Sequence, residues 1–175
     1  MHSGWILNEV LRPRLPKNGA AILGLTATDL WPGRGWNFVF GQASLGHRVG
    51  VWSLARYGDP SESEVAFALA LERALKVASH ETGHMLGLNH CIAWNCNMNG
   101  SNHLSESDAK PMHLCPECTA KVVWGTIVDP AKRAQGLAAF GLSYHLPADD
   151  VSLWRASDRL IREHSSTPQK HSLSR

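Results

Sequence analysis

Residues 61–90 read SESEVAFALALERALKVASHETGHMLGLNH, and this stretch decides the fold class that we predict. Alanine and leucine dominate it without an interrupting proline, and Ser61 with Glu64 three residues later is a capping-box pattern. Gly87 is a natural helix C-cap. The stretch therefore predicts one long helix over residues 62–86. The face expected to pack on a sheet consists of Phe67, Leu71, Ala74, Leu75, Ala78 and Thr82.

Short apolar segments precede this helix. Residues 20–25 form an apolar run typical of a buried strand, and residues 36–40 and 49–55 are rich in β-branched and aromatic side chains. We expect these three segments to form a small sheet. A short helix over residues 3–11 is expected before it.

The chain after the long helix differs in character. It is loop-rich as far as Cys118, and helices are expected over residues 130–140 and 149–164. Trp124 and Trp154 are expected to anchor this part. Sheet, long helix and closing helices together predict an α+β fold whose upper part resembles an α/β arrangement.

Length and composition favour one domain. A chain of 175 residues with 43% hydrophobic content can bury one core. We predict a single domain over residues 1–164, with an upper part of about 1–87, a lower part of about 88–164, and a disordered tail over 165–175.

Charge and hydropathy limit the partners that we expect. The formal net charge is +2, and the charged residues are spread along the chain, so nucleic acid and anionic membranes are not expected partners. No secretory signal opens the chain, and no apolar run reaches membrane-spanning length. We expect a soluble, cytoplasmic monomer.

The end of the long helix carries three candidate zinc ligands. His80 and His84 are four residues apart and therefore stand on one helical face. Gly87 lets the chain turn back, so that His90 supplies a third nitrogen and a fourth position stays open. Glu81 is rotated by about 100° from His80, where it would miss the ion and approach a water on it. This pattern predicts hydrolysis by a metal-activated water with Glu81 as general base.

All four cysteines fall in one segment, as Cys91, Cys96, Cys115 and Cys118. Two closely spaced pairs in a reducing compartment are typical of a zinc site rather than of disulfides. Four thiolates leave no open position, so this second zinc would be structural. Because His90 and Cys91 are neighbours, we expect their side chains to leave an extended backbone on opposite sides, and the thiolate zinc to brace the third histidine.

Further stretches surround these ligands: WNFVFGQASL (36–45), Arg56-Tyr57, Met98, GSNHL (100–104) and CPEC (115–118). Together with HETGHMLGLNHC (80–91), they resemble the archaemetzincin family of zinc metallopeptidases over most of residues 20–130. The resemblance implies a metzincin-like fold, with a small mixed sheet and the active-site helix over a loop-rich, helical lower part. It also implies that Met98 forms an apolar floor beneath the catalytic zinc.

The resemblance implies a peptide or protein substrate that binds in extended form beside an edge strand. Residues 49–54 are our candidate for that strand. Trp52, Arg56 and Tyr57 could line the same cleft, but core packing is the more frequent role of such a tryptophan, and we leave all three out of the site. Four other histidines lack a partner at metal-binding spacing and are also left out: His47, His103, His113 and His145.

Two other functions remain open. A non-catalytic zinc module would use the cysteine site to present a surface to a partner, although such a module has no use for Glu81. A zinc hydrolase of a non-peptide amide or ester would need the same zinc, water and base. The residues do not separate this last function from peptide hydrolysis.

Overall fold

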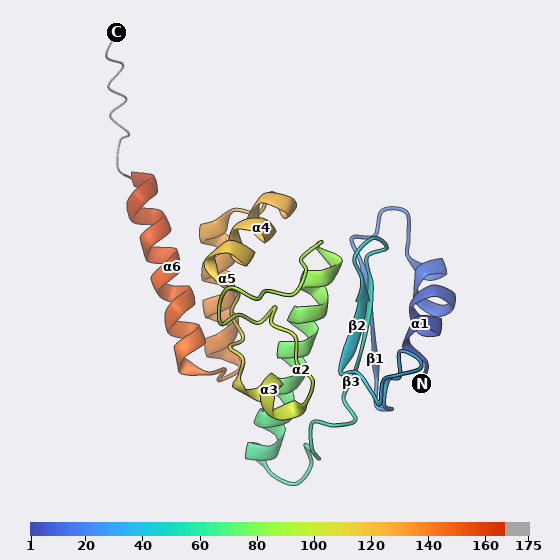
Figure 1. The fold of residues 1–175 in the computed structure, drawn as a ribbon. Helices are drawn as coiled ribbons and strands as arrows, with labels where there is room; N and C mark the ends of the chain where they lie inside the picture. Colours follow the sequence, from blue (N-terminus) through green and yellow to red (C-terminus); the bar gives the residue numbers. More distant parts are fainter. Residues whose placement is uncertain (167–175) are drawn as a thin grey trace. The chain divides into compact units, whose positions relative to one another are not determined.

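A three-stranded mixed sheet organises the first part of the chain in the computed structural model, which describes residues 1–166 (Figure 1). The central strand β3 (Val49–Ser53) pairs in parallel with β1 (Ile22–Thr26) and antiparallel with β2 (Gly41–Ser44). The small mixed sheet is therefore confirmed. Our candidate for a peptide-binding edge, residues 49–54, was wrong, because β3 is enclosed by a neighbour on each side.

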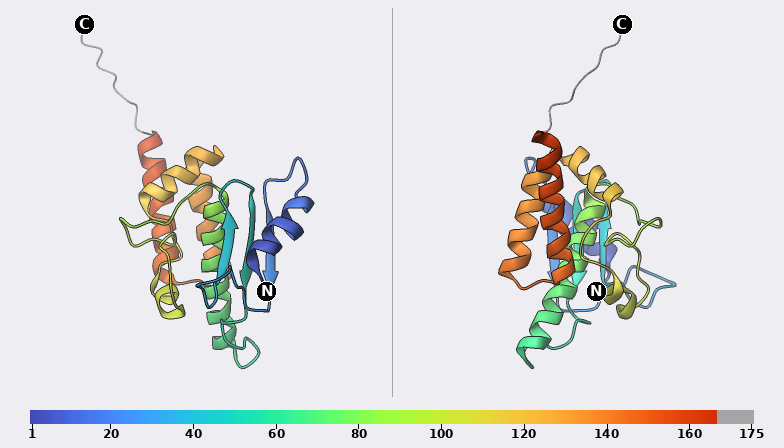
Figure 2. Two further views of the ribbon diagram at one scale, coloured as in Figure 1. Left: turned by 45° about the vertical axis from the view of Figure 1, so that its right-hand side comes forward. Right: turned by 90° about the vertical axis from the view of Figure 1, so that its left-hand side faces the viewer.

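Helices cover both faces of this sheet (Figures 1 and 2). One face carries a continuous helical run of α1 (Ser3–Trp5), the π-helix η1 (Ile6–Leu11) and the 3-10 helix η2 (Arg12–Arg14), which contains the predicted short helix. Fully burying an aliphatic side chain contributes about 1.5–3 kcal/mol, so this layer is a substantial part of the core. Its buried members are Ile6, Leu7, Leu11, Leu30, Val49 and Val51.

The opposite face of the sheet receives the long helix α2 (Glu64–Met85). Trp52 and Tyr57 pack there against Val77, with Ala74 and Ala78 beside them, so part of the predicted helical face is confirmed. Phe67 is 56% exposed, against the prediction. The beginning of α2 extends past the end of the sheet, which leaves the first turns without a partner layer (Figure 1).

The ends of α2 are set by local chemistry. The N-cap is Ser63, whose hydroxyl accepts a hydrogen bond from the Ala66 N–H at 3.1 Å, and not Ser61, which donates to Asp59 instead. Gly87 follows the last turn with φ +87°, a left-handed conformation that only glycine adopts at low cost. This turn sends the chain back along α2, as expected.

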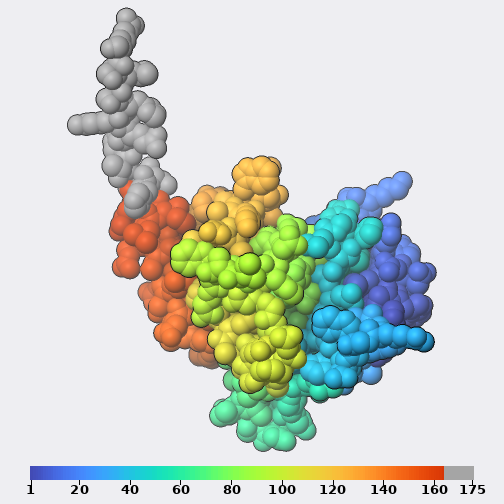
Figure 3. Space-filling model, in the orientation of Figure 1, coloured from blue at the N-terminus to red at the C-terminus, as the bar shows by residue number. Residues whose placement is uncertain are grey.

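The segment after α2 passes over that helix on the face seen in Figure 3. It contains the short helix α3 (Leu104–Ala109) and then α4 (Pro116–Thr126). Helix α4 was not expected, because its first turn lies within the cysteine motif, which we interpreted as loop.

The chain divides into two compact units, Met1–Gly125 and a second that begins at Thr126. In the second unit α5 (Pro130–Ser143) packs on α6 (Ala148–Ser166), so both predicted closing helices are confirmed. Trp154 is buried, as expected, and lies against Gly141. A single domain over residues 1–164 stays a prediction, and residues 167–175 of the predicted tail lie outside the described residues.

Three other expectations were wrong. Residues 36–40 form no strand and contribute one isolated bridge, between Val39 and Leu30. Strand β1 is not buried on both faces, because Leu23 and Leu25 are 48% and 63% exposed. Trp124 is 86% exposed and anchors nothing.

Among residues 1–166, no helix is long and apolar enough to cross a membrane.

Candidate metal centres and active site

Three histidine side chains converge where α2 ends. His80 and His84 come from its last turns, and His90 returns to them after the Gly87 turn. The ring centroids of His80 and His84 are 4.6 Å apart. The centroid of His90 lies 5.2 Å from that of His80 and 4.9 Å from that of His84. One ring nitrogen of each lies within 4.8 Å of the others, so the three could hold one metal ion.

The backbone fixes which nitrogens face inward. His80 Nδ1 lies 2.8 Å from the Asn97 carbonyl oxygen, and His84 Nδ1 lies 2.7 Å from that of Leu88. A carbonyl oxygen only accepts, so each Nδ1 carries the proton and donates. Both Nε2 atoms are then unprotonated, and they face each other at 3.1 Å. Two opposed lone pairs at this distance fit a cation that both nitrogens bind.

Burial supports neutral imidazoles at this site. It lowers the pKa of His80 to about 3, and it lowers that of His90 as well. Neutral histidine is the form that binds a metal ion. The donor set and its protonation therefore fit a zinc ion with three nitrogen ligands.

Glu81 lies on the side of α2 that faces the sheet. Its carboxylate packs against the first residue of β2, where a β-carbon added to Gly41 would lie 2.5 Å from Glu81 Oε1. Burial raises the pKa of Glu81 to about 8, and the positive charge of Lys110 opposes that rise. The carboxylate is thus confined between the active-site helix and an edge strand.

The four cysteine sulfurs form a second cluster within 4.8 Å of one another, and none of them forms a disulfide. Cys96 Sγ accepts backbone N–H groups of Cys115 at 3.2 Å and Met98 at 3.4 Å, while Cys115 Sγ accepts that of Cys118 at 3.4 Å. Burial raises the pKa of the Cys96 thiol, and the two N–H groups that it accepts oppose that rise. Zinc binds the thiolate form. This donor set fits a closed site with four sulfur ligands.

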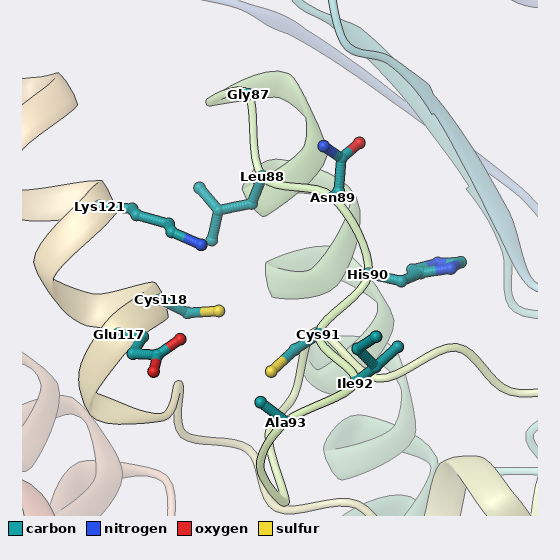
Figure 4. A pocket seen from close by; sticks show the side chains of 10 residues that line it. All are labelled: Gly87, Leu88, Asn89, His90, Cys91, Ile92, Ala93, Glu117, Cys118 and Lys121. Carbon is teal, nitrogen blue, oxygen red and sulfur yellow. The ribbon is translucent and has the colours of Figure 1, made fainter.

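His90 and Cys91 face opposite sides of the chain. Figure 4 shows the His90 side chain directed away from α4 and the Cys91 side chain directed toward Cys118 on that helix. The expected divergence of these neighbours is confirmed. On the α4 side the segment Gly87–Ala93 lines a pocket of about 370 Å³, together with Glu117 and Lys121.

A turn, Asn97–Asn99, touches both clusters. It follows Cys96, its Asn97 carbonyl accepts from His80, and the Cys91 N–H donates to its Met98 carbonyl at 2.9 Å. The Asn99 side chain donates to the Cys91 carbonyl and accepts the Cys96 N–H at 2.9 Å. The same turn therefore holds the backbone of two cysteines and supplies the carbonyl that orients His80.

Met98 is fully buried beneath the end of α2. Its sulfur lies directly under Gly83, where any β-carbon would overlap it. Gly83 is the residue before His84, so the methionine packs against the helix turn that carries this histidine. Its role as the floor of the histidine cluster belongs to the proposal below.

The residues that we left out of the site lie elsewhere. Trp52 and Tyr57 are buried in the core between α2 and the sheet, and Arg56 pairs with Asp29 at 2.8 Å. The two groups of possible metal ligands found among residues 1–166 include none of the four histidines that we left out of the site. Two of these have local roles, because His47 contacts Ser44 and His103 caps α3.

Sequence reasoning missed the groups that act through the backbone. Nothing in the residue types of Leu88 and Asn97 signals that their carbonyls orient two imidazoles. Gly83 did leave a signal, since a glycine next to the predicted ligand His84 suggests a close approach of another group. Gly41, between Phe40 and Gln42, left none.

The chain is similar to known proteins over the region that contains both clusters. The model of Peptidase family M54 matches residues 9–123. Archaemetzincin-2 of Mus musculus is 38% identical over 148 residues, which cover 70% of this chain and 41% of that protein. The chain thus spans about two fifths of the length of this relative.

Two solved structures are also similar. Archaemetzincin from Methanopyrus kandleri superposes with a TM-score of 0.62 at 37% identity, over 72% of this chain and 66% of that one. A protein described as a zinc-dependent peptidase from Methanocorpusculum labreanum gives a TM-score of 0.51 at 30% identity, over 58% and 53% of the two chains.

Proposed function

Because the chain belongs to peptidase family M54, the family of the archaemetzincins, we propose that it is a zinc metallopeptidase that hydrolyses peptide bonds. The observation that carries this proposal is the pair of unprotonated Nε2 atoms, 3.1 Å apart and held by backbone carbonyls, with His90 beside them. Similarity to a protein described as a zinc-dependent peptidase supports the choice of metal and reaction.

We assign one zinc ion to His80, His84 and His90, and a second to the four cysteines. With three protein ligands, the histidine site keeps a position for a reactant, as catalytic zinc sites do. When bound there, zinc supplies Lewis acidity that polarises a peptide carbonyl and acidifies water. The thiolate site has no such position and would be structural.

Glu81 is the group that moves the proton. Its carboxyl group lies on the same helix as two ligands but is not one of them, so its ionised form can accept a proton from the attacking water. Burial raises its pKa to about 8, and the positive charge of a zinc ion bound nearby would favour the ionised form. The same oxygen can then donate that proton to the leaving amine. Met98 packs under Gly83 and would keep the histidines above it in place.

The substrate would lie beside β2. This strand is an edge of the sheet, and its first residue touches Glu81. An extended peptide added to that edge would use backbone hydrogen bonds for affinity and would bring its carbonyls past the catalytic residue. A peptide or protein is therefore the proposed partner.

We further propose a reducing compartment, the cytoplasm, and a monomer. Four free cysteines gathered in one metal-type cluster, rather than paired as disulfides, support the compartment. The dispersed charge and net charge of +2 support a partner other than nucleic acid.

Two other functions stay as alternatives. A non-catalytic zinc module is disfavoured by Glu81, since burying a carboxylate beside the histidines has a cost that a purely structural site would avoid. Hydrolysis of a non-peptide amide or ester would use the same groups. Assay of the zinc-loaded chain on a mixed peptide library, beside a panel of simple amides and esters, separates the three functions.

Gly41→Ala provides a test of the proposed geometry in that assay. A methyl group at position 41 would displace the Glu81 carboxylate, and misplacing a catalytic group by about 1 Å can lower the rate about a hundredfold. We expect such a loss in kcat with unchanged zinc content.

Gly46→Ala is the matched control, because a β-carbon there meets nothing within 4 Å. It should cleave like the wild type. Full activity of Gly41→Ala would show that Glu81 does not work from the position described.

A further inference from the structure

A lysine outside both clusters holds the turn between them. Lys110 follows α3 in extended conformation, and its ammonium group donates to the Asn99 carbonyl at 2.8 Å. The Asn97 carbonyl lies 3.5 Å from the same nitrogen. Lys110 therefore contacts the backbone on both sides of Met98, the residue that packs under Gly83.

Both carbonyls belong to the connection between the two clusters. The Asn97 carbonyl is the acceptor that fixes the tautomer of His80. Asn99 binds the Cys91 carbonyl and the Cys96 N–H through its side chain. A shift of this turn would therefore reorient one histidine and loosen two cysteines at once.

Among residues 1–166, Lys110 is found in no ion pair. Asp108, two residues before it, binds Arg73 at 2.7 Å instead. Lys110 is partly buried, and burial lowers its pKa to about 8, whereas the charge of Glu81 opposes that change. A partly buried ammonium has a desolvation cost, which its hydrogen bonds to backbone carbonyls offset.

We propose that Lys110 is a positioning residue that clamps the turn Asn97–Asn99 and thereby strengthens metal binding at the histidine cluster without touching a ligand. The inference rests on the proposed function in assigning a metal ion to that cluster. It goes further by stating that the metal affinity of that cluster depends on Lys110, a residue at the end of α3.

The clamp acts through orientation. With the ammonium in place, the Asn97 carbonyl points at His80 Nδ1 and keeps its Nε2 directed at His84. Loss of such an outer contact typically lowers metal affinity by about 10- to 100-fold. Because Lys110 reaches Asn97 from 3.5 Å and Asn99 from 2.8 Å, we expect an effect near the lower end, about tenfold.

The test is a Co²⁺ titration of the metal-free chain of residues 1–175. Cobalt bound by thiolates has an intense charge-transfer absorption that cobalt bound by histidines lacks, so the two sites are read separately. Lys110→Met should bind cobalt at the histidine cluster about tenfold more weakly, with the thiolate band close to that of the wild type. Lys110→Arg should restore most of the affinity, since a guanidinium can donate to both carbonyls.

Lys76→Met is the matched control. Lys76 is also a buried lysine that donates to a backbone carbonyl, that of Asp108 at 2.9 Å, but its ammonium group does not touch the turn. This variant should lower the melting temperature and leave the cobalt affinity of the histidine cluster unchanged. If Lys110→Met does not fold, Lys110→Gln replaces it and is judged by the same affinity.

Equal cobalt affinity in the wild type and the Lys110 variant would overturn the inference. So would an equal loss in Lys76→Met, which would mean that any buried lysine supports the site through general packing. A wild-type chain whose histidine cluster takes up no cobalt would refute the proposed function, and the inference with it. A chain that binds cobalt at the histidine cluster but cleaves no peptide would refute peptide hydrolysis alone. The cobalt affinities of the wild type and the Lys110 variants would then still decide the inference about Lys110.

Discussion

Glu81→Gln is expected to lower peptide cleavage by about 10²- to 10⁴-fold, the usual contribution of a general base, while both metal ions stay bound. Glutamine has nearly the same shape as glutamate but cannot accept the proton of the attacking water. Because Glu81 is not among the clustered ligands, metal content should not change. Cleavage rate and zinc per chain, measured on the same preparation, check both statements.

Glu72→Gln on the same helix is the control. Its carboxylate pairs with Lys76 and lies more than two turns before His80. This variant should keep the wild-type cleavage rate. A Glu81→Gln enzyme that cleaves like the wild type would refute the assignment of Glu81, whereas loss of metal in that variant would assign it to the ligand set.

Cys96→Ser is expected to remove the ion of the thiolate cluster and also to weaken metal binding at the histidine cluster, which Cys96 does not touch. Metal binding supplies much of the folding free energy of small zinc sites, about 10–16 kcal/mol in zinc-finger peptides. Without that ion the turn Asn97–Asn99 loses its anchor on one side, and the Asn97 carbonyl no longer orients His80. We expect histidine-site affinity to fall by more than tenfold.

Cys118→Ser separates the effect of the ion from that of the turn. Cys118 belongs to the same cluster but lies on α4, outside the turn. If the bound ion braces His90, both variants should weaken the histidine site. Unchanged histidine-site affinity in both, with melting curves that show a folded chain, would mean that the two sites are independent.

The parts of the fold that sequence predicted well are those in which a local pattern determines the structure. The helix around His80 and His84 follows from propensity without a proline, and the turn after it follows from the one residue type that tolerates φ +87°. The two closing helices follow from similar patterns. The two clusters of candidate ligands were also predictable, because the spacing of such residues in the chain limits their spacing in space.

The errors occurred where tertiary context decides. Residues 36–40 have strand-like composition, yet the chain pairs the next four residues with β3. The first of these, Gly41, has no side chain to overlap the Glu81 carboxylate. Phe67 has the correct helical spacing, but it belongs to the start of α2, which extends past the end of the sheet, and it is 56% exposed. Strand order is also absent from local pattern, which is why β3 was taken as an edge.

The groups that orient the site were beyond sequence reasoning for a related reason. A backbone carbonyl is present at every residue, so no residue type marks Asn97 or Leu88 as the acceptor of an imidazole proton. No sequence pattern marked Lys110 either. Its contact with the turn Asn97–Asn99 depends on where α3 ends, and that position is known only from the folded chain.

Zinc content of the wild type and of His84→Ala tests the central claim most directly. His84 contributes a ligand to the histidine cluster and none to the cysteine cluster. Elemental analysis should find two zinc ions per wild-type chain and one per His84→Ala chain, and only the wild type should cleave a mixed peptide library. One zinc ion in each protein, with no cleavage by either, would mean that the histidine cluster holds no catalytic metal and would contradict the account.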